Sequence, residues 1–283
     1  MTVSQMPAQK QERQPGFERE MRPQPDYEPK YPGVGKLKGK VALITGGDSG
    51  IGRAVAVAMA REGAKIAIVY LDEHKDANET REAVKREGSE AILLPGDVGD
   101  EAFCEAAVDA TVEQFGQLDI LVNNAGEQHE TEDVREIDAQ QIEHTFRTNV
   151  FSFFFMAKHA LRHMDEGATI INTTSITAYQ GHKTLLDYSA TKGAIVTLTR
   201  SLAEALIKDG IRVNAVAPGP IWTPLIPASF EPEHVAKHGS SAPMQRPAQP
   251  NEVAPCYVFL ASDEASYISG QVLHPNGGNM VGS

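Results

Sequence analysis

Short apolar runs alternate with helix-length amphipathic segments along most of this chain of 283 residues, and few folds accommodate that alternation. Continuous apolar runs are typical of strands buried on both faces, and they lie at residues 41–44, 66–69, 91–94, 120–122, 169–171 and 213–216. Helical segments separate them at residues 50–62, 75–87, 101–115, 138–164 and 187–209. Strict alternation implies right-handed crossovers. We therefore predict one doubly wound α/β domain, closed by a helix near 251–261 and a seventh strand near 271–274.

The two ends of this pattern differ in composition from the rest. Residues 1–38 hold six prolines, charges of both signs and almost no aliphatic side chains. Such a segment cannot bury enough apolar surface to offset its chain entropy, so we expect an extended or disordered arm unless another surface holds it. Phe17, Tyr27 and Tyr31 are its candidate anchors. Residues 39–283 then form the folded domain, in which the proline-rich segment 218–250 is typical of an irregular functional lid.

Charge and hydropathy exclude several partners. The net charge of −12 and the lack of a basic stripe oppose binding to nucleic acid or to anionic lipid. No apolar run reaches the roughly 18 residues that span a bilayer, and the N-terminus lacks a signal-peptide pattern, so we expect a cytoplasmic protein. Cys104 and Cys256 have no metal-ligand spacing and are expected to be packing residues. No histidine pair has zinc-site spacing, so no metal is predicted and small molecules are the expected partners.

Three groups that can donate or accept a proton lie close together in the sequence: Ser175, Tyr188 and Lys192. A spacing of four places Lys192 one helical turn from Tyr188 on the same face. An ammonium near a phenol favours the phenolate and so lowers a pKa that is ordinarily about 10. This arrangement suits proton transfer to or from an alcohol oxygen, although Tyr-x-x-x-Lys alone also occurs on ordinary helix faces.

A glycine-rich turn follows the first strand and leads into the first helix. Residues 45–52 read Thr-Gly-Gly-Asp-Ser-Gly-Ile-Gly. Glycines at such a turn let the backbone approach a pyrophosphate, whose charge then lies on free N–H groups at the helix N-terminus. Turns need glycine for other reasons too, but the position between strand and helix favours dinucleotide binding.

Together these motifs resemble the short-chain dehydrogenase/reductase family in its single-domain Rossmann form. The elements that carry the resemblance occur in family order from about residue 36 to the C-terminus: residues 45–52, Asn-Asn-Ala-Gly at 123–126, Asn149, Ser175, Tyr188 with Lys192, and Pro-Gly-Pro-Ile-Trp-Thr at 218–223. Within the family, the chain resembles the stress-associated bacterial branch with a proline-rich N-terminal arm.

The resemblance implies a set of cofactor-binding residues. Asp97 also suits a helix cap, and residues 123–126 also suit a simple strand-ending turn. The implied set for NAD or NADP comprises Gly46, Asp48, Ser49, Gly50, Ile51, Gly52, Tyr70, Asp97, Val98, Asn124, Ala125, Gly126, Tyr188, Lys192, Pro218, Gly219, Ile221 and Thr223.

The resemblance also implies the catalytic roles. Ser175 would bind the substrate oxygen, Tyr188 would act as general acid/base, and Lys192 would lower the tyrosine pKa and hold the nicotinamide ribose. Asn149 would hold its helix open around a water that relays protons to Lys192. Its other interpretation is an ordinary buried asparagine satisfied by backbone.

Cofactor preference depends on the end of the second strand. Tyr70, Leu71 and Asp72 stand there, no arginine follows to hold a 2′-phosphate, and Asp48, Asp72 and Glu73 would repel one. The sequence therefore favours NAD. His182 could line a substrate pocket, but a surface-loop histidine is the preferred interpretation.

Two functions of different class follow. The first is an oxidoreductase that moves a hydride between NAD(P) and an aldehyde, ketone, sugar or polyol. The second is a cofactor-binding regulatory or scaffold protein on the same fold, which the complete Ser, Tyr, Lys and Asn set disfavours. Family resemblance further implies a homotetramer, with helices 101–115 and 138–164 packing across one two-fold axis and the last strand across another.

Overall fold

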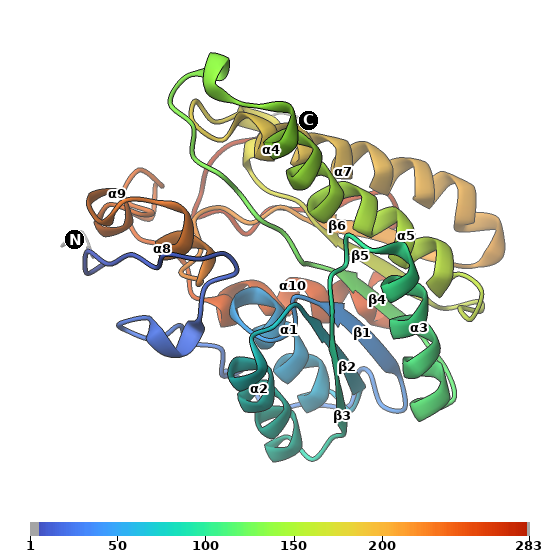
Figure 1. Cartoon of the computed structure of the whole chain (residues 1–283). Helices are drawn as coiled ribbons and strands as arrows, with labels where there is room; N and C mark the ends of the chain where they lie inside the picture. Colours follow the sequence, from blue (N-terminus) through green and yellow to red (C-terminus); the bar gives the residue numbers. More distant parts are fainter. Residues whose placement is uncertain (1–5, 282–283) are drawn as a thin grey trace.

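Seven parallel strands form one twisted sheet at the centre of the molecule (Figure 1). The computed structural model describes residues 6–281. The strands lie in the order β3-β2-β1-β4-β5-β6-β7, with bounds β1 Val41–Thr45, β2 Lys65–Tyr70, β3 Ala91–Pro95, β4 Ile120–Asn123, β5 Thr169–Thr173, β6 Arg212–Val216 and β7 Val272–Leu273. Strands β2 and β3 lie on one side of β1, and β4 to β7 lie on its other side, so the strand order changes direction between β1 and β4. Ligands of such sheets bind at this switch point.

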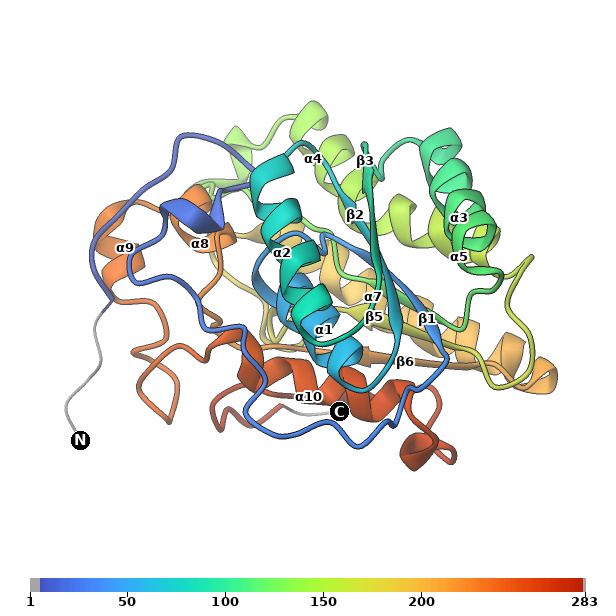
Figure 2. The ribbon, with the colours of Figure 1, turned by 90° about the horizontal axis from the view of Figure 1, so that it is seen from below.

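Helices cover both faces of the sheet, as Figures 1 and 2 show. One core lies under α1 (Gly50–Arg61), α2 (His74–Arg86) and α10 (Pro250–Ala261). The other lies under α3 (Glu101–Phe115), α5 (Ser152–Ala160) and α7 (Leu186–Leu206). The remaining helices and turns are α4 Ala139–Phe146, α6 Thr177–Gln180, α8 Leu225–Ser229, α9 Pro232–Ala236, η1 Glu18–Glu20, η2 Val134–Glu136, η3 Arg147–Phe151, η4 Ile207–Asp209 and η5 Asp263–Ala265. The predicted doubly wound fold is confirmed.

One expectation about local structure is confirmed in part, and another is wrong. The segment 138–164 is helical without a break from Ala139 to Ala160, but it contains the π-helical turn η3 between α4 and α5 and ends before residue 164. The proline-rich segment 218–250 is not irregular throughout, since it contains α8 and α9. These helices have five residues each, too few to show a helical period in the sequence.

The arm packs on the core of its own chain. Figures 1 and 2 show it, in dark blue, running past α8 and along α2. Its strongest attachment is Glu18, whose side chain is buried, pairs with buried Arg53 at 2.6 Å and accepts a hydrogen bond from the Gly50 N–H at 2.5 Å. A buried carboxylate needs such partners, because leaving water costs several kcal/mol.

Met21 and Trp222 make the apolar attachment. Both side chains are fully buried in one cluster, and the Trp222 indole N–H donates to the carbonyl of Pro23 at 2.9 Å. Among the expected anchors, Phe17 lies between the guanidinium groups of Arg13 and Arg19. Tyr27 packs against the core. Tyr31 is not an anchor, since it is 78% exposed.

Glu18→Ala should weaken docking of the arm, because it leaves Arg53 buried without its closest carboxylate. We expect the free energy of unfolding to fall by about 3 kcal/mol. Trp222 is the single tryptophan of the chain, so its emission should shift to longer wavelength as Met21 and Pro23 leave it. Glu20→Ala, an exposed carboxylate in the same turn, is the control. Identical emission and stability for the two variants would show that the pair does not hold the arm.

Candidate active site

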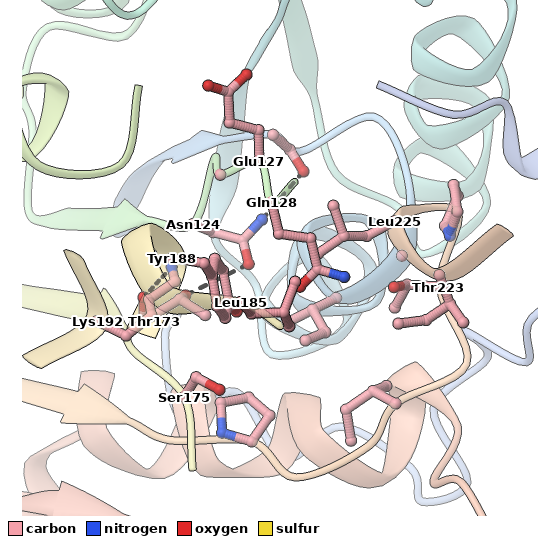
Figure 3. Close-up of a pocket in the computed structure, with 18 of the residues that line it drawn as sticks. Asn124, Glu127, Gln128, Thr173, Ser175, Leu185, Tyr188, Lys192, Thr223 and Leu225 are labelled. Atoms are coloured by element: carbon pink, nitrogen blue, oxygen red, sulfur yellow. Dashed lines mark hydrogen bonds between the residues drawn. The ribbon is translucent and has the colours of Figure 1, made fainter. Parts of the chain in front are cut away.

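A cavity of about 520 Å³ lies at the carboxyl ends of the strands, around the switch point. Its walls include the glycine-rich turn after β1, the ends of β2 and β4, the first turn of α7 and the segment that follows β6. Figure 3 shows Tyr188, Lys192 and Ser175 on one side of it and Thr223 with Leu225 on the other. The volume suits a small-molecule or cofactor site, for which about 300–1,000 Å³ is typical.

The three proton-handling residues meet on this wall. Tyr188 and Lys192 lie one turn apart on α7, and Ser175 follows β5. The Lys192 Nζ donates to the carbonyl of Thr173 at 3.1 Å and lies 5.3 Å from the centre of the Tyr188 ring. Because β5 and α7 are anchored in the core, these groups keep fixed positions relative to the cavity.

Burial dominates the titration of both α7 groups. It raises the pKa of Tyr188 to about 12, while the neighbouring Ser175 hydroxyl acts in the opposite direction. It lowers the pKa of Lys192 to about 7. The lowered tyrosine pKa expected from the sequence is therefore not found in the protein alone. The positive charge expected to lower the Tyr188 pKa is that of the Lys192 ammonium, and burial disfavours this charged form as well.

Asn149 occupies the π-helical turn η3 and uses its whole amide group. The side-chain Nδ2 donates to the carbonyl of Glu127 at 2.9 Å and to Thr191 Oγ1 at 3.1 Å. The Oδ1 accepts from the Glu127 N–H at 2.8 Å. Asn149 thus joins the segment after β4 to α7. These contacts match the interpretation of a buried asparagine satisfied by backbone, within a helix that is indeed widened.

The glycine-rich turn has the shape that a pyrophosphate requires. Gly46 and Gly50 have φ values of +62° and +52°. A Cβ on Gly52 would lie 1.9 Å from the Gly46 carbonyl oxygen, so Gly52 packs beneath the turn, whereas Gly46, Ser49, Gly50 and Ile51 line the cavity. The first turn of α1 points N–H groups without intrahelical acceptors at this space. Glu18 takes that of Gly50, and the others fit an anion.

Tyr70, Asp97 and Val98 line the end of the cavity near β2 and β3, where the cofactor prediction places them. Asp97 Oδ1 also accepts from the Gly99 N–H at 2.7 Å, so it stabilises its own turn. The Asp48 side chain is buried beside the same end, and burial raises its pKa to about 6.

Residues after β4 and β6 face the turn from the other side. The Thr45 Oγ1 accepts from the N–H groups of Asn124 and Ala125 at 2.9 and 3.0 Å. Asn124, Ala125 and Gly126 line the cavity there. So do Pro218, Gly219, Ile221 and Thr223 of the segment that begins the lid. The predicted cofactor residues other than Gly52 thus surround one space.

Several cavity residues were missed or misread from the sequence. His182 lies in the loop between α6 and α7, as preferred, but it is half-buried and lines the cavity. Gln128 lines it as well, next to residues 14–16 of the arm. Their positions depend on contacts between distant parts of the chain, and no local pattern indicates those contacts. Among the described residues, no helix is long and apolar enough to cross a membrane.

A Rossmann sheet with a glycine-rich turn and a tyrosine–lysine pair at the same cavity defines a class of dinucleotide-dependent oxidoreductases. A family model described as enoyl-(acyl carrier protein) reductase matches residues 46–279. The chain belongs to the short-chain dehydrogenase/reductase family.

Curated relatives match over nearly the whole chain. It is 62% identical to General stress protein 39 of Bacillus subtilis (strain 168), covering 98% of this chain and 97% of that protein. It is 55% identical to Glucose and ribitol dehydrogenase of Daucus carota, covering 98% of each. It is also 55% identical to NADPH-dependent aldehyde reductase 1, chloroplastic, of Arabidopsis thaliana, covering 96% and 98%.

A solved structure agrees with this assignment. A short chain dehydrogenase from Burkholderia cenocepacia J2315 in complex with NADP superimposes with a TM-score of 0.81 at 33% identity, covering 86% of this chain and 98% of that one. The protein is therefore an NAD(P)-dependent oxidoreductase of the family that acts on CH–OH groups.

Asn149→Ala should destabilise the fold and loosen the turn beside Lys192, because it leaves two partly buried backbone groups of Glu127 without partners. We expect a loss of about 2 kcal/mol in the free energy of unfolding, at roughly 1 kcal/mol for each group, the lower end of the cost of an unpaired buried group. Urea unfolding measures it. Asn78→Ala, which removes exposed hydrogen bonds to the His74 carbonyl and from Arg81, should cost no more than about 1 kcal/mol, because both bonds are open to water. Equal losses would contradict the bridging role.

Proposed function

We propose that the protein transfers a hydride between NAD(P) and an alcohol or carbonyl carbon, with Tyr188 as the general acid/base. One observation carries the proposal. Ser175, Tyr188 and Lys192 lie on the wall of the same cavity as the glycine-rich turn, so a dinucleotide on that turn can extend to them. A scaffold function would not require three proton-handling groups at the end of a cofactor cavity.

Each residue has a separate task. The dinucleotide supplies or accepts the hydride. Ser175 donates a hydrogen bond to the substrate oxygen, and Tyr188 gives that oxygen a proton during reduction or removes one during oxidation. Lys192 is fixed by the Thr173 carbonyl, beside the phenol ring, and orients the nicotinamide ribose. Asn149 keeps α7 in place through Thr191.

We propose a polar, hydroxylated aldehyde, sugar or polyol as substrate. Gln128 and His182 offer hydrogen-bonding groups on the cavity wall near Tyr188, and His234 of α9 adds a third from the lid. Relatives named glucose and ribitol dehydrogenase and aldehyde reductase support this class. In this proposal, residues 39–283 are the catalytic domain, residues 218–250 its substrate lid and residues 1–38 an arm, and the enzyme works in the cytoplasm.

One of the two arguments for a preference for NAD does not hold in the folded chain. The preference was inferred from the acids after β2 and from the lack of an arginine after them. The structure brings Arg13 of the arm to Asp72 and Glu73, at 2.5 and 2.6 Å. We therefore propose that the site accepts NADP as well as NAD.

Tyr188→Phe should cut turnover by about 10²–10⁴-fold, the contribution of a general acid/base. Dinucleotide affinity should change little, because the phenyl ring keeps its place. Steady-state rates on a panel of aldoses, polyols and aldehydes measure turnover, and fluorescence titration measures affinity. Tyr179→Phe, the same change on nearby α6, should leave turnover within a factor of a few. More than a third of wild-type turnover in Tyr188→Phe would identify another proton carrier.

We further propose that the enzyme is a homotetramer in which α5 packs across a two-fold axis. Phe151 and Phe154 are 42% and 51% exposed, and interfaces between subunits are where such aromatic side chains become buried. Phe154→Asp should reduce the mass in solution, measured by sedimentation, to that of a smaller species. Val34→Asp, which also places a charge on an exposed apolar position but on the arm, should not. A tetramer that persists in Phe154→Asp would place the interface elsewhere.

A further inference from the structure

The arm forms part of the wall of the cavity. On the lid side, Lys10 pairs with Glu231 at 2.7 Å and the Gln11 N–H donates to the Pro227 carbonyl. Gln14 then exchanges two hydrogen bonds with the backbone of Gln128, at 2.7 and 3.1 Å. Gln14, Pro15 and Gly16 line the cavity. A dinucleotide in the cavity would therefore lie against the arm.

Arg13 precedes the cavity-lining Gln14 and contacts the end of the cavity next to β2 through Glu73. Its Nη2 donates to Asp72 Oδ1 at 2.5 Å and to Glu73 Oε1 at 2.6 Å. Glu73 itself lines the cavity together with Tyr70 and Leu71. In a Rossmann fold, the end of the second strand is where the adenosine ribose binds. Arg13 thus reaches the ribose site from a segment outside the Rossmann motif.

The guanidinium group has donors to spare. Within residues 6–281, only Nη2 of Arg13 donates to a protein acceptor, although an arginine carries five N–H donors. Its face stacks on the Phe17 ring, 4.4 Å from the ring centre, which fixes the plane of the fork. The N–H groups of Nε and Nη1 make no hydrogen bond to the described residues, and each can donate to a phosphate oxygen.

The acids that the sequence analysis treated as repulsive are compensated in the folded chain. Asp72 is paired with Arg13. The Glu73 carboxyl is buried, and burial together with its hydrogen bond to Asp72 raises its pKa, which favours its neutral form. Asp48 is buried behind them. The local charge near the ribose is therefore far less negative than the sequence indicates.

We propose that Arg13 of the arm is a specificity-determining residue, which binds the 2′-phosphate of NADP(H) and makes the arm part of the dinucleotide site. This inference rests on the proposed oxidoreductase function. In Rossmann folds an arginine near the end of the second strand can accommodate that phosphate. Here the arginine comes from a segment that precedes the first strand, and its contact with Glu73 holds it at the cavity.

The test compares R13Q with R19Q in the full-length protein. Both guanidinium groups stack on Phe17, but Arg19 faces Asp76, which does not line the cavity. NADPH and NADH are titrated separately, without substrate, by fluorescence. R13Q should weaken NADPH binding about tenfold or more, the effect of losing a charge-assisted phosphate contact, and NADH binding less than about threefold. R13K, which keeps the charge but not the fork, should fall between R13Q and wild type.

The outcomes separate the two proposals. Trp222 emission reports whether the arm stays docked, and R19Q controls for general loosening of Phe17. Equal losses of NADPH affinity in R13Q and R19Q, or equal losses of NADPH and NADH affinity in R13Q, would overturn the role of Arg13. A wild-type protein that binds neither dinucleotide would instead overturn the proposed function.

Discussion

The contact between the turn after β1 and the turn after β4 is the constraint on which the site depends. One hydroxyl, Thr45 Oγ1, accepts from two successive backbone N–H groups across the switch point. Asn124 returns the contact through its Nδ2 to the Gly46 carbonyl at 3.2 Å. Because the two strands are parallel neighbours, these bonds fix how far the crevice between their carboxyl ends can open. The glycine-rich turn, α1 and the wall that carries Asn149 are all positioned from this point.

Burial both positions the proposed catalytic groups and opposes their charged forms. Tyr188 and Lys192 have rigid neighbours because α7 is packed in the core, yet the same packing raises one pKa and lowers the other. The chain places the Thr173 carbonyl on Nζ and the Ser175 hydroxyl near the phenol, and both contacts are short-range and directional. A proton carrier near neutral pH therefore needs further positive charge close to the phenol, which an oxidised nicotinamide ring carries when bound.

The sequence was sufficient to predict features that repeat along the chain or that lie within one short motif. Apolar runs at strand spacing predicted the sheet. The glycine-rich turn and Tyr188 with Lys192 could be located as cavity residues, because each is a short motif in one stretch of the chain. Asn149 could be located but not its partner, since Glu127 follows a different strand. The sequence did not favour His182 as a cavity residue, because the cavity wall is built from segments far apart in the chain. What the sequence could not supply was contact between segments far apart in the chain.

The arm shows this limit most clearly. Its composition correctly excludes independent folding, but composition says nothing of where each charge will lie. In the structure, charged residues of the arm pair with residues of opposite charge in α1 and at the start of α2. Arg13 meets Asp72 and Glu73, Glu18 meets Arg53, and Arg19 approaches Asp76. Removing the arm from this surface would leave buried carboxylates facing one another around a single arginine. The acids at the start of α2 and the arginines of the arm therefore form one electrostatic unit, and the ribose end of the cavity lies beside it.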